Sequence, residues 1–480
     1  MQKDFHAATR TNNREENTPA AIFRVEQRTI GFIPESDRKG KPSSLFAIWF
    51  SANMQVTTVV TGGLAVILGL NLFWAVVAIV IGNLVGGVFM AFHSAQGPKL
   101  GIPQMIQSRA QFGVIGAILP LILVILMYIG FFASSAVLGG MALASLLHLP
   151  FWAALFITNL GTFVLVVYGY DMIHRYERYV SYLFAVVFLF LTGKLLALPA
   201  VGAAFSQHAF AFGPFFLVLS IVATWQITYA PYVADYSRYL KSDTRMAATF
   251  WYTYLGSVIG TVWMMTVGAI GAQVAASAFN ASATDYIAGL AGSSLTWLIY
   301  IVVLLGIVAA NVLNLYGGFM SITTTVSAFS KIGFTSNART VIAGFIAVLG
   351  SALAIWGQGN FLNNYSSFLL LLLYFLVPWT AVNLVDFYLV RHGSYDMDSI
   401  FRLDGIYGAV NWTALVAYIV AIALEFPFMN TTLYVGPISK YLGNADFAWI
   451  VGLIVASVIY YFPMKAKLAR SSALVSSSSR

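Results

Sequence analysis

Long apolar segments with almost no charge follow one another along most of this chain. Only 9% of the 480 residues are charged, whereas a soluble domain carries about 25%. A bilayer core needs roughly 20 apolar residues per helix, and β-barrel strands would instead alternate over about 10 residues. We therefore expect an all-α polytopic membrane protein of about twelve transmembrane helices. The expected spans are residues 44–69, 72–93, 116–147, 151–170, 179–199, 213–236, 248–277, 294–322, 339–357, 361–390, 407–427 and 446–464.

The basic residues support this number of spans. If both termini are cytoplasmic, all but two of the 25 Lys and Arg residues fall on the cytoplasmic side, the exceptions being Lys194 and Lys440. Such an excess is the usual orientation signal of membrane proteins. The net charge of +8 is therefore expected to orient the chain in the cell inner (plasma) membrane and to meet anionic lipid. Nucleic acid is not an expected partner.

The sequence offers no sign of catalysis or of a metal. It contains no cysteine, which excludes disulfides, thiolate metal sites and a cysteine nucleophile. No Walker motif indicates direct use of ATP, and the loops between the expected spans are too short for a separate domain. We expect a monomeric transporter rather than an enzyme, with no cofactor, and with its site inside the helical bundle.

Polar and aromatic clusters interrupt the first and the sixth expected spans. They are residues 49–55 and residues 224–232, and the second contains Pro231, which lacks a backbone donor. Irregular backbone within a membrane is tolerated where it lines a cavity, and many transporters bind substrate at such breaks in two matching halves. The alternative is ordinary packing between helices. The residues expected at a site here are Asn53, Gln55, Thr224, Trp225 and Gln226.

Two other spans carry candidate binding residues. Asn311 and Asn314 of the eighth span lie three residues apart, so they share one helix face and suit the edge of a planar heterocycle. The alternative is an amide clamp between helices. In the third span an aromatic ring could stack on a flat substrate, or it could simply face lipid. The candidates there are Tyr128, Phe131, Phe132 and Ser135.

Several of these segments are familiar in combination. The chain resembles the nucleobase–cation symporter family, in its purine–cytosine permease branch, over roughly residues 22 to 465. The resemblance implies a LeuT-like fold with a five-plus-five inverted repeat, two further helices, and alternating access for a nucleobase or related ring. The segments that carry it are residues 49–55, 82–87 (GNLVGG), 97–98, 101–113 (GIPQMIQSRAQFG), 234–239 (ADYSRY) and 310–316 (ANVLNLY).

The same resemblance implies an organisation of the chain. A cytoplasmic tail would precede a ten-helix transport core of two repeats, and two additional helices and a second cytoplasmic tail would follow it. The corresponding residues are 1–43 for the first tail, 44–390 for the core, 44–199 and 213–390 for its repeats, 391–464 for the additional helices and 465–480 for the second tail.

The resemblance also implies roles for individual residues. Trp225 matches the aromatic residue that stacks on the base, and Gln55 matches an amide near the site. Asn314 matches the asparagine of the eighth helix, with Asn311 one turn earlier. The aromatic and polar pair of the third helix matches Phe131 and Ser135, where relatives usually have Trp and then Asn or Gln. A shifted register would place Tyr128 and Phe132 there instead.

The coupling ion is expected to be a proton rather than sodium. In sodium-coupled relatives the ion site uses carbonyls of the first helix, here those of Ser51 and Met54, and two hydroxyls of the eighth. The matching residues of the eighth helix, Ala309 and Ala310, carry no side-chain oxygen. A proton acceptor is not evident, because Asp235 is expected to pair with Arg238. Asp386 and Glu425 lie near helix ends and are given no role.

The sequence thus favours an importer of cytosine, adenine or hypoxanthine by proton symport. One alternative keeps the fold and changes the cargo to a hydantoin, allantoin, or vitamin-like pyrimidine or pyridine ring, with sodium as the other candidate ion. The altered pair in the third helix motivates that alternative. A membrane enzyme acting on lipid, or a channel, is the alternative from another class.

Overall fold

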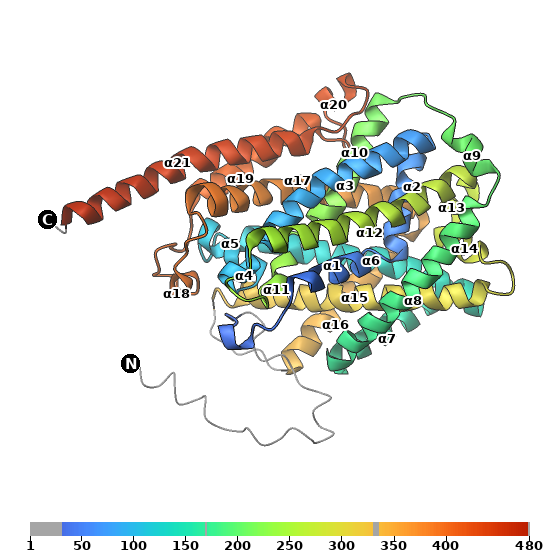
Figure 1. Cartoon of the computed structure of the whole chain (residues 1–480), viewed down its shortest axis with the longest axis horizontal. Coiled ribbons are helices and arrows are strands. Elements are labelled where there is room, and N and C mark those ends of the chain that lie inside the picture. Colours follow the sequence, from blue (N-terminus) through green and yellow to red (C-terminus); the bar gives the residue numbers. More distant parts are fainter. Residues whose placement is uncertain (1–30, 169, 330–335, 479–480) are drawn as a thin grey trace, which may run out of the picture.

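The computed structural model describes residues 31–168, 170–329 and 336–478 of the chain. Within these ranges the chain is helical, with two isolated β-bridges and no strand. Most of the helices lie side by side in one elongated bundle (Figure 1). The helices of the bundle are α1 (Pro42–Ala52), α2 (Val56–Ile67), α3 (Leu72–Ser94), α6 (Ile118–Leu147), α7 (Phe151–Tyr168), α8 (Tyr170–Leu196), α10 (Phe212–Ile227), α12 (Met246–Val274), α15 (Thr296–Val326), α16 (Ser336–Gly357), α17 (Phe361–Leu384), α19 (Trp412–Glu425) and α21 (Ala448–Ser478).

These helices coincide with the twelve expected spans. Among the described residues, six helical segments are long and apolar enough to cross a membrane, or seven if α1 and α2 count as one bent span. One of the six, Asn337–Val390, contains both α16 and α17. Shorter apolar helices occupy four other expected spans. The last helix is longer than expected, because α21 continues past residue 464 to Ser478 and projects beyond the bundle (Figure 1).

Short helices lie at the two ends of the bundle. The α5 end, on the left of Figure 1, carries α4 (Gly97–Leu100), α5 (Gln104–Phe112), α11 (Val233–Ser237) and α18 (Met397–Ile400). The opposite end carries α9 (Ala200–Phe205), α13 (Ala276–Ala281) and α14 (Ala283–Gly289). The expected substrate site lies between these ends, in the interior of the bundle.

The first and sixth spans are both broken, as the sequence predicts. α1 ends at Ala52, α2 begins at Val56, and the two helices meet at 62°. Gln55, directly before α2, is extended, with φ −145° and ψ 157°. α10 ends at Ile227, and helix resumes only with α11, beyond Pro231. The residues of both breaks are mostly buried, and backbone N–H groups there bond to nearby carbonyls, as Met54 does to Ser51 and Tyr229 to Gln226.

Small residues allow the broken first span to pack closely on α12. A Cβ added to Gly268 would lie 1.7 Å from the carbonyl oxygen of Val59, and one added to Gly62 would lie 1.9 Å from that of Met265. The two backbones are therefore in direct contact, and any side chain at these positions would force them apart. Close approach at small residues is a common way for membrane helices to pack.

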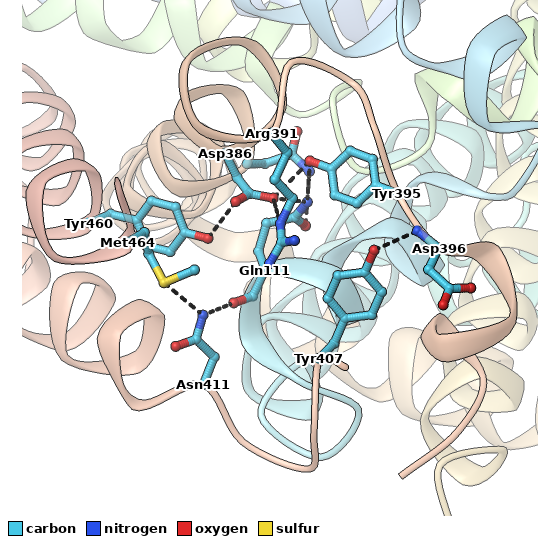
Figure 2. A network of polar contacts seen from close by, with 10 residues as sticks. Gln111, Asp386, Arg391, Tyr395, Asp396, Tyr407, Asn411, Tyr460 and Met464 are labelled. Atoms are coloured by element: carbon cyan, nitrogen blue, oxygen red, sulfur yellow. Dashed lines mark hydrogen bonds and ion pairs between the residues drawn. The ribbon is translucent and has the colours of Figure 1, made fainter. Parts of the chain in front are cut away.

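The additional helices are joined to the core through Asp386, which lies just after α17 in the π-helical turn Val385–Val390. The carboxylate of Asp386 is fully buried. It accepts hydrogen bonds from Tyr460 of α21 (2.8 Å), Tyr395 (2.7 Å) and Gln111 of α5 (3.2 Å), and its ion pair with Arg391 spans 3.3 Å. Figure 2 shows Asp386 among these partners. One carboxylate thus fastens three separate segments to α17.

Candidate functional site

Asn53 joins the two broken spans. Its side-chain oxygen accepts hydrogen bonds from the indole N–H of Trp225 (2.7 Å) and from the hydroxyl of Tyr229 (2.9 Å). Its amide nitrogen donates to the carbonyl oxygen of Trp49 (2.7 Å) and to Ser257 of α12 (3.2 Å). Both ends of the buried amide are occupied. Asn53 therefore positions the aromatic rings of Trp225 and Tyr229. The sequence predicted that Asn53 contributes to the substrate site, but in the structure its amide has no free atom with which to bind a substrate.

Gln226 is engaged in the same way. Its oxygen accepts from Ser257 (2.6 Å), and its nitrogen donates to Asn83 of α3 (2.8 Å) and to Thr261 of α12 (3.1 Å). The neighbouring Thr224 donates to a carbonyl of its own helix. The sequence placed Thr224 and Gln226 among the substrate contacts, whereas in the structure Gln226 holds α10 against α3 and α12, and the hydroxyl of Thr224 is bonded within α10.

Aromatic rings surround Trp225, which is buried. Phe131 of α6 lies 6.1 Å from it between ring centroids, with the two ring planes at 90°. Phe131 also meets Phe368 of α17 at 5.2 Å, edge to face. The rings of Trp225 and Phe131 therefore do not form a parallel sandwich in this conformation. A flat substrate between them would require the Phe131 ring to turn.

The structure distinguishes the two registers considered for α6. Phe131 points toward Trp225, whereas the ring of Phe132 packs on Gly350 of α16, where an added Cβ would lie 2.4 Å from it. The ring of Tyr128 lies 5.6 Å from that of Tyr232, on the α5 side of the cluster. Of the two registers, the one with Phe131 and Ser135 thus has its aromatic residue beside Trp225, and Ser135 is buried on the same helix.

The two asparagines of α15 lie together. Asn311 is buried and donates to the carbonyl oxygen of Phe132 (3.3 Å), and Asn314 donates to the side-chain oxygen of Asn311 (3.2 Å). Asn311 thus holds α15 against α6, as the clamp interpretation predicts. Asn314, which is only partly buried, retains hydrogen-bonding capacity beyond this contact, because an amide offers two donor hydrogens and two acceptor sites.

Gln55 has the free polar atom that Asn53 and Gln226 lack. Its nitrogen donates to the carbonyl oxygen of Ala52 (3.0 Å), but its buried side-chain oxygen has no partner among the described residues. A buried acceptor without a donor is costly. Such an atom, at a helix break and two residues after Asn53, is suited to accept a hydrogen bond from an N–H group of a ligand.

The predicted cation region remains a prediction. The Ser51 carbonyl accepts the backbone N–H of Met54 at 3.0 Å, across the break between α1 and α2. Ala309 and Ala310 lie in the middle of α15, half-buried. They bring no side-chain oxygen to that helix, in keeping with the sequence.

A small cavity lies between helix α5 and the aromatic rings around Trp225. Asp235, which lines the cavity, accepts a hydrogen bond from the backbone N–H of Gln104 of α5 at 2.8 Å. Arg109, also of α5, donates to the carbonyl of Thr324 at the end of α15 (2.7 Å). Burial lowers the pKa of Arg109 to about 10, so its guanidinium stays charged at neutral pH. The cavity is lined by Pro103, Met105, Tyr128, Pro231, Asp235, Gly317, Met320, Ser321 and Thr324.

Comparison with known proteins identifies the family. Residues 32–452 match the family described as "Permease for cytosine/purines, uracil, thiamine, allantoin". The chain belongs to this permease family. It is 46% identical over 448 residues to the "Putative purine-cytosine permease YxlA" of Bacillus subtilis, covering 93% of this chain and 98% of that one. It is 25% identical to the hydantoin permease of Microbacterium maritypicum, over 94% and 88% of the two chains.

The fold is that of a solved member of the nucleobase-cation-symport-1 family. The chain matches Mhp1, in a closed conformation with bromovinylhydantoin bound, with a TM-score of 0.75 and 20% identity over 93% of this chain and 96% of Mhp1. The permease is thus a multi-pass, all-helical membrane transporter with a LeuT fold, as the resemblance implied. It belongs to a family of transporters and not of enzymes.

Sequence reasoning missed several residues that contact Asn53, Gln226 or Phe131. Tyr229 stands in the same interrupted segment as Trp225 and could have been chosen for its hydroxyl. Ser257 and Thr261 of α12 are spaced by one helical turn, which marks a shared face, but a few hydroxyls in an apolar helix are common. Phe368 gave no signal, because it is one of 37 phenylalanines in the chain.

Proposed function

We propose that this permease imports a nucleobase such as cytosine, adenine or hypoxanthine by proton symport with alternating access. The observation that carries the proposal is that the fixed ring of Trp225 occurs together with two amide side chains, Gln55 and Asn314, that keep unused hydrogen-bonding atoms. Asn53 holds the indole of Trp225 by its edge, so a face of the ring can stack on a base. Gln55 and Asn314 keep unused polar atoms close to the broken span and on α15.

The chemistry of a nucleobase suits these groups. Its ring is flat, and its edge alternates N–H donors with nitrogen and oxygen acceptors. The free oxygen of Gln55 would accept from an N–H, and the amide of Asn314 would serve either role. The name of the Bacillus subtilis relative, a purine–cytosine permease, agrees with this substrate class.

The proposed orientation places both termini and the α5 end in the cytoplasm. Lys99, Arg109, Arg238 and Arg402 all belong to segments of the α5 end, in agreement with the rule that basic residues stay inside. The core of residues 44–390 would move between outward and inward states while residues 391–464 remain fastened to it.

A second candidate cargo is a hydantoin or a related ring. Phe131 stands where relatives usually have Trp, and one relative is named a hydantoin permease. The smaller ring leaves more room beside Trp225 than an indole would. Competition between labelled cytosine and unlabelled hydantoins, allantoin and vitamin rings separates the two candidates.

Uptake by proteoliposomes tests the proposal. Labelled cytosine, adenine and hypoxanthine should accumulate when the outside is more acidic than the inside, and a sodium gradient alone should give no accumulation. Trp225→Ala should abolish uptake, because the stacking surface is lost. Accumulation that required sodium would overturn proton coupling, and undiminished uptake by Trp225→Ala would overturn the site.

A further inference from the structure

The transport helix α3 contains a buried histidine that the site described above does not use. His93 is fully buried near the α5 end of α3. Its Nδ1 lies 2.9 Å from the carbonyl oxygen of Phe89. A carbonyl can only accept, so Nδ1 carries the hydrogen of the neutral ring and Nε2 carries the lone pair. Nε2 is buried and has no hydrogen-bond partner among the described residues. The ring therefore presents a free base inside the protein.

One face of the buried ring has a neighbour that would attract a positive charge. His93 stacks on Trp379 of α17, with ring centroids 5.0 Å apart and planes 22° from parallel. The face of an indole attracts a cation, and this attraction increases when water is excluded. The indole N–H of Trp379 donates to Ser108 of α5 at 2.9 Å, which fixes its orientation. Protonation of His93 would therefore strengthen its contact with α17 and, through Trp379, the contact between α17 and α5.

Most of the buried ionisable groups of the elements around this end of α3 are already engaged. Tyr388 donates to the carbonyl of Phe92 at 2.8 Å, and Tyr254 of α12 donates to the carbonyl of Leu84 at 3.1 Å. α10 and α2 contain no ionisable side chain. Asp235 of α11 is held by Gln104, Arg109 of α5 by Thr324, and Asp386 beyond α17 by the partners in Figure 2. Of the other groups nearby, Lys99 of α4 is exposed and Tyr236 of α11 packs on Trp49.

A chain of amides links the helix of His93 to the α5 end. Gln96, one turn beyond His93, donates to Asn383 of α17 (2.8 Å), and Asn383 donates to Gln111 (3.4 Å). Gln111 in turn donates to Asp386, whose neighbour Tyr395 lies in the loop beyond α17 (Figure 2). A series of hydrogen-bonded polar side chains thus extends from Gln96, near His93, to Asp386 at the end of the bundle that is proposed to face the cytoplasm.

The same helix reaches the substrate site in the other direction. Asn83 of α3 lies ten residues before His93, or about 15 Å along the helix axis, and it accepts a hydrogen bond from Gln226 of the broken sixth span. A change in the charge of His93 can therefore bias α3, and through Asn83 the segment that carries Trp225. This is the connection that coupling between an ion and a substrate requires.

We propose that Nε2 of His93 is the binding site of the coupling proton. The inference rests on the proposed proton symport and names the residue that performs it. In the binding step the lone pair of Nε2 takes a proton from hydronium, one N–H bond forms, one O–H bond breaks, and water is released. In the release step the imidazolium returns its proton to water at the cytoplasmic side, and the neutral ring is restored.

Three carboxyl groups among the described residues are fully buried and are rival sites, namely Asp386, Asp446 and Glu425, and of these only Glu425 has oxygens without a hydrogen-bond partner. Both carboxyl oxygens of Glu425 are buried without a hydrogen-bond partner. The carboxyl packs on Gly452, where an added Cβ would lie 1.5 Å from Oε1, so it sits between the two additional helices, α19 and α21. Among the described residues the carboxyl of Glu425 makes no hydrogen bond to α1 or α10, and its charged neighbour Asp446 meets α10 only through a backbone carbonyl, which accepts from Ser220 at 3.1 Å. Glu425 therefore lacks a side-chain connection to the broken sixth span of the kind that α3 makes through Asn83.

The test separates exchange from coupling in proteoliposomes of the full-length protein. Counterflow of labelled against unlabelled cytosine at equal pH needs no net proton movement, whereas accumulation driven by a pH gradient does. His93→Gln should keep counterflow and lose both gradient-driven accumulation and the cytosine-dependent acidification of an internal pH dye. His208→Gln, which changes an exposed histidine, and Glu425→Gln should behave as wild type.

Each outcome bears on the inference. Accumulation and acidification by His93→Gln at wild-type levels would overturn it while leaving the proposed function intact, and loss of both in Glu425→Gln alone would move the site to Glu425. Wild-type protein that exchanges no nucleobase, or accumulates it only with sodium, would overturn the proposed function and the inference together.

A spectroscopic measurement covers the case in which His93→Gln does not fold. In a variant whose other histidines are all Gln, the 15N NMR signal of a single imidazole should change from neutral to doubly protonated as the pH is lowered. This change should move to a different pH when cytosine is added. A ring that stays neutral wherever transport is proton-coupled would overturn the proposal. The residues replaced are His6, His148, His174, His208 and His392.

Discussion

At the scale of single residues, the two amides at the first break do different work. Asn53 has both ends of its side chain hydrogen-bonded, whereas the oxygen of Gln55 has no partner. A satisfied buried amide contributes to stability, and an unsatisfied one costs free energy until a ligand reaches it. The two residues, two positions apart, should therefore respond oppositely to mutation.

Gln55→Leu should weaken cytosine binding without loss of folding stability. Removal of one neutral hydrogen bond to the substrate is worth about 0.5–1.5 kcal/mol, or up to about tenfold in Kd. Stability should change little, because removal of the unpaired buried oxygen offsets loss of the hydrogen bond from Gln55 to the carbonyl of Ala52. Isothermal titration and thermal unfolding of the detergent-purified protein provide the two readings. Unchanged Kd would show that the free oxygen of Gln55 does not meet the substrate.

Asn53→Ala should lower stability and transport together. The indole N–H of Trp225 and the hydroxyl of Tyr229 would lose their acceptor in a buried environment, at a cost of about 1–3 kcal/mol each. Asn159→Ala is the matched control, because Asn159 of α7 is also a buried amide and donates to Ser351 of α16 at 2.8 Å. The control should lower the unfolding temperature but leave cytosine affinity unchanged. Equal affinity losses in both variants would deny Asn53 its positioning role.

At the scale of elements, the broken first span is held by backbone contact with α12. The bend of 62° redirects α2, and the packing of α2 on α12 then leaves no space for a side chain at Gly62 or Gly268. An interrupted helix has fewer internal hydrogen bonds, so its position depends on such contacts. The site at the break is consequently sensitive to a residue that touches no substrate.

Gly268→Ala should destabilise the protein and reduce transport. The new methyl group would overlap the carbonyl of Val59, and overpacking of this kind typically costs about 1–3 kcal/mol. Gly161→Ala in α7 is the control, since a Cβ there meets nothing within 4 Å. We expect that control to be neutral or slightly stabilising. Thermal unfolding and cytosine uptake of the two variants, measured side by side, test this prediction. Equal unfolding temperatures and equal uptake would contradict the close contact between α2 and α12.

At the scale of the whole molecule, a buried carboxylate connects the transport core to the last two helices. Asp386 receives bonds from α5, from the loop after α17 and from α21, and it pairs with Arg391 (Figure 2). The network lies at the α5 end, away from Trp225. It should therefore govern assembly of the bundle rather than recognition of the substrate.

Asp386→Ala should be strongly destabilising, because it leaves Arg391 without its buried partner. Removal of one member of a buried ion pair costs about 3–5 kcal/mol. Asp404→Ala, which breaks an exposed pair with Arg402, should change stability little. Thermal unfolding of both variants tests this difference. A mild effect at Asp386, similar to that at Asp404, would show that the additional helices are held by apolar packing alone.

The sequence by itself determined the class of the molecule and where its helices break. Apolar length, the distribution of Lys and Arg, and Pro231 are local properties, and the cost of leaving backbone groups unpaired in lipid forces them into helices around an interior break. The sequence also brought Trp225, Gln55 and Asn314 forward. Only the tertiary structure decided which amides are free, because Asn53, Gln226 and Asn311 find their partners on distant segments.

The same reason explains what no pattern revealed. Whether Phe131 or Phe132 faces Trp225, and whether Nε2 of His93 has a partner, depends on how α6, α16 and α17 pack. Those contacts join residues far apart along the chain, and local composition carries no record of them. A buried polar atom is known to be satisfied or free only when every neighbour around it has been placed.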